Sequence, residues 1–161
     1  MKNLILIRHG KSDWNNNLSD QFRPITKKGE KRSLLAANKL NDFLNFTPKY
    51  IYSSITTRAK QTANIFQSIS FPNQNIRYDK DLYTFSHIAL EKWIKNLEFS
   101  IDHVIIFGHN PAFTDIANEL GSIYISNLPT SGIVWIEFEI NDWKDLKKGI
   151  TKHIILPKEL E

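Results

Sequence analysis

The first ten residues, MKNLILIRHG (residues 1–10), place a short apolar segment directly before an arginine and a histidine. Met1–Ile7 is dominated by Leu and Ile, which is typical of a buried strand. The segment ends abruptly at two polar side chains, Arg8 and His9. The sequence therefore predicts that these two residues lie where the first strand ends.

The rest of the chain repeats an order of apolar strand, polar turn and helix. Further strands are expected at Tyr50–Tyr52, Ile76–Tyr78 and His103–Phe107, and two antiparallel or edge strands at Ile133–Ile140 and Ile150–Leu156. Four helices with one apolar face are expected. The first covers about Lys27–Leu44 with Thr26 as N-cap, and the next two lie around Ala59–Phe66 and Ala89–Leu97. The fourth extends to Leu120, with Asn110 as N-cap and Pro111 as first helical residue. The stretch Lys11–Gln21 lacks apolar periodicity and is expected to be an irregular loop or a short helix. This order predicts an α/β fold, a three-layer α/β/α sandwich with a mostly parallel central sheet.

Length and composition exclude several classes of protein. A chain of 161 residues is about one average domain long, so we expect residues 1–161 to form a single domain. No apolar run approaches the ~20 residues of a membrane-spanning helix, and the first residues lack the long apolar region of a signal peptide. There is no cysteine, which excludes disulfides, thiolate metal sites and a cysteine nucleophile. We expect a cytoplasmic protein with no membrane partner.

The charge pattern indicates a solvated surface. The net charge of +4 comes from 21 Lys and Arg against 17 Asp and Glu scattered along the chain, and no RNA or DNA motif is present. We therefore expect no nucleic-acid partner. A basic cluster is expected to be a solvated helix face, with guidance of an acidic partner protein as the alternative: Lys27, Lys28, Lys31 and Arg32.

Four side chains that can bind or attack a phosphoryl group follow the predicted strands. Arg8 and His9 follow the first strand, Arg58 comes a few residues after the second, and His109 follows His103–Phe107. Ligands of open α/β sheets collect at the carboxyl ends of the strands. Two guanidiniums can hold phosphate oxygens, and two imidazoles can supply a nucleophile and a further donor. The four groups are therefore expected to converge on one anion.

Three sequence blocks resemble the motifs of the histidine phosphatase superfamily. These blocks are RHGKSDWN from Arg8 to Asn15, SSITTRAKQTA from Ser53 to Ala63, and GHNP from Gly108 to Pro111. The third block, with Pro129, Thr130, the region of Trp143 and the end of the chain, is similar to the SixA-type phosphohistidine phosphatase branch. Gly10 departs from the Ala common in that branch and matches the wider superfamily. The resemblance implies a phosphoglycerate mutase-like fold over nearly the whole chain.

The resemblance also implies roles for individual residues. His9 attacks phosphorus and becomes transiently phosphorylated, while Arg8, Arg58 and His109 hold the phosphoryl oxygens. Asn15, Ser12 and Gly10 are expected to contribute to substrate binding. No metal and no cofactor is expected. His9 must attack as a neutral imidazole, and we expect its other ring nitrogen to bind a backbone carbonyl.

No general acid is evident in the sequence. Many superfamily members carry a Glu shortly after a Leu in the middle of the chain, whereas here Leu82 is followed by Tyr83, Thr84 and Phe85. The remaining candidates are weak: Asp79, Asp81 and His87. Phosphohistidine needs less help from an acid than a phosphomonoester does, because its leaving imidazole can be protonated beforehand. We therefore expect a phosphohistidine in a signalling or phosphotransfer protein as the substrate.

Other functions stay open at the level of sequence. The first alternative is a small-molecule phosphomonoesterase of the same superfamily, and the second is a non-catalytic module that binds a phosphorylated partner. A phosphoglycerate mutase is disfavoured because it needs a longer chain around a closed site and an acid that is absent. The sequence predicts no particular oligomeric state. The remaining histidines and tryptophans are expected to be structural: His103, His153, Trp93, Trp135 and Trp143.

Overall fold

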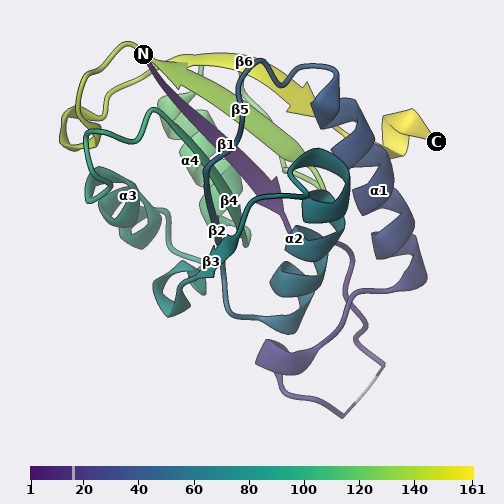
Figure 1. The fold of residues 1–161 in the computed structure, drawn as a ribbon. Helices are drawn as coiled ribbons and strands as arrows, with labels where there is room; N and C mark the ends of the chain where they lie inside the picture. Colours follow the sequence, from purple (N-terminus) through teal and green to yellow (C-terminus); the bar gives the residue numbers. More distant parts are fainter. Residues whose placement is uncertain (16) are drawn as a thin grey trace.

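A six-stranded mixed sheet forms the centre of the computed structural model, which describes residues 1–15 and 17–161 (Figure 1). The strands are β1 (Lys2–Arg8), β2 (Tyr50–Ser53), β3 (Ile76–Tyr78), β4 (His103–Gly108), β5 (Ile133–Phe138) and β6 (Ile150–Ile155). Their order is β3-β2-β4-β1-β5-β6. The first four strands of this order run parallel, and β5 and β6 continue the sheet in antiparallel pairs. The mostly parallel sheet and its two final antiparallel strands are as predicted.

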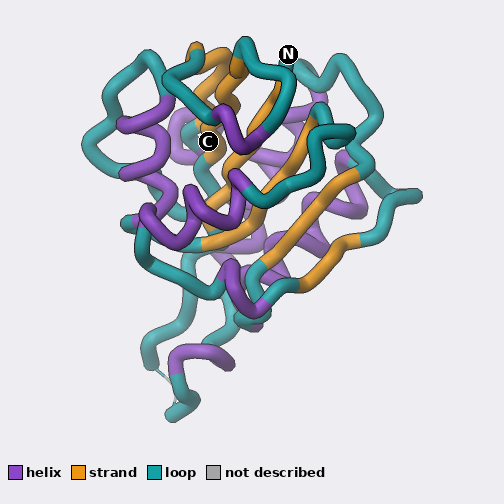
Figure 2. Tube along the Cα trace, turned by 90° about the vertical axis from the view of Figure 1, so that its left-hand side faces the viewer, coloured by secondary structure: helices purple, strands orange, loops and turns teal. Residues whose placement is uncertain are grey.

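Helices cover both faces of the sheet. The α-helices are α1 (Lys27–Asn41), α2 (Thr57–Ser70), α3 (His87–Lys95) and α4 (Ala112–Leu120), and short 3-10 turns are η1 (Asp20–Phe22), η2 (Lys80–Leu82), η3 (Trp143–Asp145) and η4 (Pro157–Leu160). Helices α1 and α2 pack together on one face, and α3 and α4 on the other (Figure 1). Figure 2 shows helical turns in front of and behind the strands. The predicted three-layer α/β/α sandwich is therefore confirmed.

The apolar segment after Met1 is buried from both sides. Leu4 and Leu6 belong to the apolar cluster that includes α3 and α4, while Ile5 and Ile7 belong to the cluster that includes α1 and α2. All four side chains are fully buried. Because successive side chains of a strand point to opposite faces, only an uninterrupted apolar run can fill two cores at once. This explains why the segment lacks an apolar and polar alternation.

Two helix ends differ from the predicted ones. Helix α1 ends at Asn41 instead of Leu44, because Phe43 and Leu44 leave the helix and pack against the cluster beneath it. Helix α4 begins at Ala112, so Pro111 takes the N-cap position. Proline has no side-chain acceptor, and the Asn110 amide oxygen instead accepts the N–H of Thr114 at 3.1 Å. Thr26 caps α1 as predicted, by accepting the N–H of Gly29.

The histidines and tryptophans expected to be structural pack in the molecule. His103 stacks on Phe46 with 3.8 Å between ring centroids, and His153 stacks on Phe43 at 4.0 Å. The tryptophans expected to pack are buried or pack against a core cluster: Trp93, Trp135 and Trp143. The prediction of structural roles for these residues is therefore confirmed.

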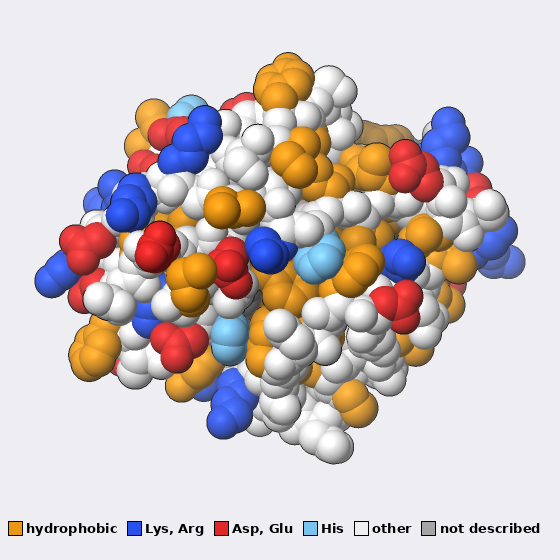
Figure 3. All heavy atoms as spheres, turned by 90° about the horizontal axis from the view of Figure 1, so that it is seen from above, with side chains coloured by type: hydrophobic (Ala, Val, Ile, Leu, Met, Phe, Trp, Pro, Cys, Tyr) orange, Lys and Arg blue, Asp and Glu red, His pale blue; other side chains and the backbone are white. Residues whose placement is uncertain are grey.

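Charges of both signs share the surface. Figure 3 views the face at the amino-terminal end of β1, where basic and acidic side chains are interspersed. From the basic cluster at the start of α1, Arg32 pairs with Glu161 at 2.9 Å. In the described part of the chain, no helix has the length and apolarity needed to cross a membrane.

Candidate active site

The register of three parallel strands brings the predicted site residues together. Arg8 in β1 pairs with Gly108 in β4, so His9 and His109 are the next residues on neighbouring strands. Their ring centroids are 5.3 Å apart. Ser53 in β2 pairs with Phe107, so Ser54 leaves the sheet at the same edge. This edge is the carboxyl end of the parallel strands, where α/β folds build ligand sites.

Helix α2 supplies Arg58 from the helical layer that it forms with α1 on one face of the sheet. Thr56 caps the helix, and the side chain of Arg58 in its first turn is 2% exposed. The Thr62 hydroxyl accepts the N–H of Gly10 at 2.8 Å and donates to the carbonyl of Arg58 at 2.8 Å. These bonds fix the start of α2 against the chain that follows His9.

His9 is held as a neutral imidazole with one nitrogen available. Its Nδ1 donates to the carbonyl of Gly10 at 2.7 Å, which is the backbone hydrogen bond that the sequence predicted. Nε2 forms no hydrogen bond with a described residue. Burial, together with the charges of Arg58 and Arg8, lowers the pKa of His9 to about 3 against the opposing effect of the Gly10 hydrogen bond. The ring is therefore uncharged at neutral pH, with a lone pair on Nε2.

Three buried side-chain nitrogens in the site lack partners. Arg8 donates through Nη1 to the carbonyl of Leu128 at 2.8 Å, and Arg58 donates through Nη1 and Nη2 to Asp20. Among the described residues, the buried side-chain nitrogen and oxygen atoms without a hydrogen bond are Arg8 Nε, Arg58 Nε and His109 Nδ1. Unpaired buried polar atoms are costly, and they cluster at sites that take a ligand. All three belong to residues predicted to hold a phosphoryl group.

Asp20 is a central site residue that the sequence analysis missed. Its carboxylate accepts from Arg58 Nη2 at 3.0 Å, from Arg23 Nη2 at 2.9 Å and from the hydroxyl of Tyr83, while its carbonyl accepts from Arg58 Nη1 at 2.6 Å. Arg23 is buried and stacks over the ring of Trp14 at 3.5 Å. The available signal was an acid, Asp20, near the end of the stretch interpreted as irregular, three residues before a base, Arg23. Asp20 thus holds Arg58 in place and brings a further cation to the site.

The carboxylate of Asp20 is ionised at neutral pH. Its partial burial acts to raise the pKa, but hydrogen bonds from Tyr83, Arg23 and Arg58 together hold that pKa well below its usual value. Of the weak acid candidates, Asp79 is bound to the indole N–H of Trp93 at 2.9 Å, and His87 lies between Asp115 and Glu119. Asp79 also caps η2 by accepting the N–H of Asp81. None of these contacts involves His9.

The three residues predicted to bind substrate differ in their surroundings. Both backbone groups of Gly10 are occupied, by Thr62 and by His9. The buried Ser12 hydroxyl accepts from Arg23. Asn15 is exposed, and its N–H donates to the carboxylate of Asp13 at 2.8 Å. In this structure Gly10 and Ser12 therefore position His9 and Arg23, and a substrate-binding role for the three residues stays a prediction.

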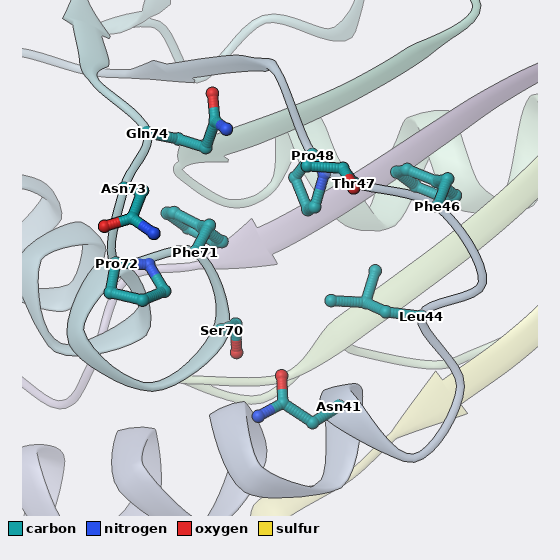
Figure 4. Close-up of a pocket in the computed structure, with 10 residues that line it drawn as sticks. All are labelled: Asn41, Leu44, Phe46, Thr47, Pro48, Ser70, Phe71, Pro72, Asn73 and Gln74. Atoms are coloured by element: carbon teal, nitrogen blue, oxygen red, sulfur yellow. The ribbon is translucent and has the colours of Figure 1, made fainter.

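One further hollow of the surface lacks the charge that a phosphate needs. A cavity of about 310 Å³ lies between the carboxyl ends of α1 and α2, and Figure 4 shows its lining. No lining residue is ionisable: they are Asn41, Leu44, Phe46, Thr47, Pro48, Ser70, Phe71, Pro72, Asn73 and Gln74. In the part of the chain that the structure describes, no cluster of three His, Asp or Glu side chains could hold a metal ion.

The chain belongs to the histidine phosphatase superfamily (branch 1), whose family profile matches residues 4–93. An uncharacterized chloroplastic protein of Arabidopsis thaliana is 27% identical over 154 residues, which cover 89% of this chain and 70% of that protein. The fold is similar to that of the protein histidine phosphatase SixA complexed with tungstate. This match has a TM-score of 0.82 at 20% identity and covers 99% of both chains.

A second similar structure is the mycobacterial glucosyl-3-phosphoglycerate phosphatase. The match has a TM-score of 0.68 at 14% identity and covers 91% of this chain and 95% of that one. These similarities confirm the phosphoglycerate mutase-like fold class expected from the sequence.

Proposed function

We propose that this protein is a phosphatase that removes the phosphoryl group of a phosphohistidine-bearing protein through a phosphorylated His9. The observation that carries the proposal is the set of three unpaired buried nitrogens, Arg8 Nε, Arg58 Nε and His109 Nδ1, beside the free Nε2 of His9. A tetrahedral oxyanion would satisfy donors at these positions. The structure of SixA carries tungstate, which is such an oxyanion.

In the first proposed step, the lone pair of His9 Nε2 attacks phosphorus. The bond between phosphorus and the substrate nitrogen breaks, and its electron pair stays on the substrate imidazole, which leaves neutral because its other nitrogen already carries a proton. His9 retains its Nδ1–H on the carbonyl of Gly10 and holds the positive charge. Phosphoryl transfer depends mainly on positioning and charge stabilisation, which Arg8 and Arg58 supply.

In the second proposed step, water attacks the phosphorus of phosphorylated His9. The bond between Nε2 and phosphorus breaks, and its electron pair returns to Nε2. The water becomes part of inorganic phosphate and releases one proton to that phosphate or to solvent. His9 is neutral again, which its low pKa favours.

The electrostatics of the site favour a leaving group that needs no acid. Asp20 is the carboxyl group that contacts Arg58, and it is ionised at neutral pH. An alkoxide leaving group would require a proton from such a group, whereas a protonated imidazole would not. The side chains near the site also include exposed aromatic rings, Trp14 and Phe85, which suit contact with a protein surface.

A small-molecule phosphomonoesterase is the second candidate, and Tyr83 is the observation that favours it. Its ring centroid lies 5.3 Å from that of His109, and its hydroxyl donates to Asp20. Burial and the Asp20 hydrogen bond raise the pKa of Tyr83, so the phenol keeps its proton at neutral pH. That proton is available to an alkoxide. For either substrate we propose action in the cytoplasm, which the cysteine-free sequence supports.

The test compares the parent protein with His9→Ala on a phosphohistidine-bearing protein and on small phosphomonoesters. We expect faster turnover of the phosphoprotein, an acid-labile phosphoenzyme, and a loss of at least about a thousandfold in kcat for His9→Ala. His87→Ala is the matched control, because this exposed histidine should leave turnover unchanged. If His9→Ala releases phosphate as fast as the parent, the assignment of His9 as nucleophile is wrong. If the parent turns over phosphomonoesters faster than the phosphoprotein, the small-molecule phosphomonoesterase is the correct candidate.

A further inference from the structure

Ser54 contacts the second histidine of the site from a neighbouring strand. It follows β2, is fully buried, and donates its backbone N–H to the carbonyl of Phe107 at 3.0 Å. Its hydroxyl oxygen lies 2.9 Å from Nε2 of His109. The serine is therefore fixed by the backbone of the sheet, and its hydroxyl is fixed on one nitrogen of the ring.

The surroundings of this hydroxyl leave its proton available to His109. The N–H of Thr56 donates to Ser54 Oγ at 3.4 Å, so the oxygen already acts as an acceptor. Its own proton is then free to be donated to His109 Nε2. A neutral imidazole carries one N–H, so a ring that accepts at Nε2 must carry its proton on Nδ1. Burial, together with the charges of Arg58 and Arg8 and against the charge of Asp20, lowers the pKa of His109 to about 2, which keeps the ring neutral.

The unpaired atom of the ring matches this assignment. His109 Nδ1 is buried without a hydrogen bond, as are Arg8 Nε and Arg58 Nε. With the proton on Nδ1, all three nitrogens are donors and suit an oxyanion. With the proton on Nε2, Nδ1 would present a lone pair to phosphoryl oxygens and repel them.

We propose that Ser54 is a positioning residue that donates its hydroxyl proton to His109 Nε2 and so fixes the tautomer whose Nδ1–H binds the phosphoryl group. The binding of a phosphoryl group by Nδ1–H rests on the proposed function, whereas the assignment of the His109 tautomer does not. Ser54 would thus act on the reaction through His109 without touching the substrate.

The tautomer is measurable without any substrate. In protein labelled with ¹⁵N-histidine, two-bond proton–nitrogen correlations at pH 7 report which ring nitrogen carries hydrogen, and a His109→Gln spectrum assigns the signals. We expect Nδ1–H in the parent and in Ser54→Thr, and a shift towards Nε2–H in Ser54→Ala. Ser53→Ala is the matched control, because this adjacent serine is equally buried and its hydroxyl donates to the Ser54 carbonyl instead. An Nε2–H signal in the parent overturns the proposal, even if Ser54→Ala fails to fold.

Oxyanion affinity provides the second measurement, with tungstate as the probe. We expect Ser54→Ala to weaken tungstate binding by about tenfold, the equivalent of one hydrogen bond, while Ser54→Thr and Ser53→Ala stay within about twofold of the parent. Equal affinity in Ser54→Ala and the parent would contradict a role in anion binding. If His9→Ala keeps full phosphatase activity while the parent shows Nδ1–H, the proposed function fails and the tautomer assignment stands.

Discussion

At the scale of single residues, Asp20 determines how the site arginines are presented. A carboxylate between two guanidiniums offsets part of their repulsion and fixes their direction. In this protein Asp20 takes Nη1 and Nη2 of Arg58 and leaves Nε unpaired. The backbone carbonyl and the carboxylate of Asp20 together therefore select which edge of Arg58 remains for a ligand, and the carboxylate also holds Arg23 beside Ser12.

We predict that Asp20→Asn lowers the free energy of unfolding. We also predict that an added oxyanion stabilises this variant more than it stabilises the parent. The side chain of Asp20 is 41% exposed, so solvent screening limits the cost of losing its charge to about 1–2 kcal/mol. Tungstate should restore part of this loss, because it returns negative charge to Arg58 and Arg23. Urea unfolding at pH 7 with and without tungstate measures both effects. Asp42→Asn, which alters an exposed pair with Lys39, is the control. Identical unfolding of Asp20→Asn and the parent would contradict this account.

At the scale of elements, the start of α1 is packed against the chain that leaves His9. A Cβ at Gly29 would lie 2.6 Å from the carbonyl oxygen of Lys11 and 3.0 Å from its nitrogen. Both are backbone atoms, so they cannot move away as the end of a flexible side chain can. The N–H of Thr26 also donates to the carbonyl of Lys11 at 2.8 Å. The helix and the His9 segment are therefore one packed unit.

We predict that Gly29→Ala destabilises the protein by about 1–3 kcal/mol and weakens tungstate binding, because the segment after His9 must shift. Gly10→Ala is the contrasting variant, since its Cβ would approach no atom closer than 3.1 Å, and the nearest is the hydroxyl of Ser33. Its effect should be clearly smaller. Urea unfolding and tungstate titration of both variants test the comparison, and a larger loss in Gly10→Ala would refute it.

At the scale of the whole molecule, folding buries two histidines in their neutral form. The pKa of His9 falls to about 3 and that of His109 to about 2, mainly because burial disfavours the charged ring. Above the ordinary histidine pKa of about 6.5, the rings are neutral in both the folded and the unfolded chain. Below it, the unfolded chain binds two protons that the folded chain does not. Stability is therefore complete above about pH 6.5 and is lost as the pH falls towards 3.

We predict a loss of about 2 kcal/mol per buried histidine between pH 7 and pH 5. Urea unfolding at the two pH values measures this loss in the parent and in the double variant His9→Asn, His109→Gln. The double variant should lose clearly less stability over the same interval. His103 and His153 titrate equally in both proteins, so their contribution cancels in the comparison. An unchanged pH dependence in the double variant would show that these histidines titrate normally in the folded protein.

Part of the candidate site could be predicted from sequence because its residues follow strands. Arg8, His9 and His109 come directly after apolar runs, and the carboxyl ends of parallel strands lie at one edge. Asp20 could not be found in this way, since it belongs to a short turn in a stretch without apolar periodicity. Its partners Arg58 and Tyr83 are 38 and 63 residues away, and no local pattern reports such pairs.

The sequence by itself determined the α/β class and the strand ends that carry the site, because apolar periodicity and polar turn residues act over a few neighbouring positions. Only the tertiary structure decided which nitrogens of the site stay unpaired, that His9 is neutral, and that Ser54 faces His109. Those properties depend on burial and on contacts between distant segments, which exist only after the strands pair in register.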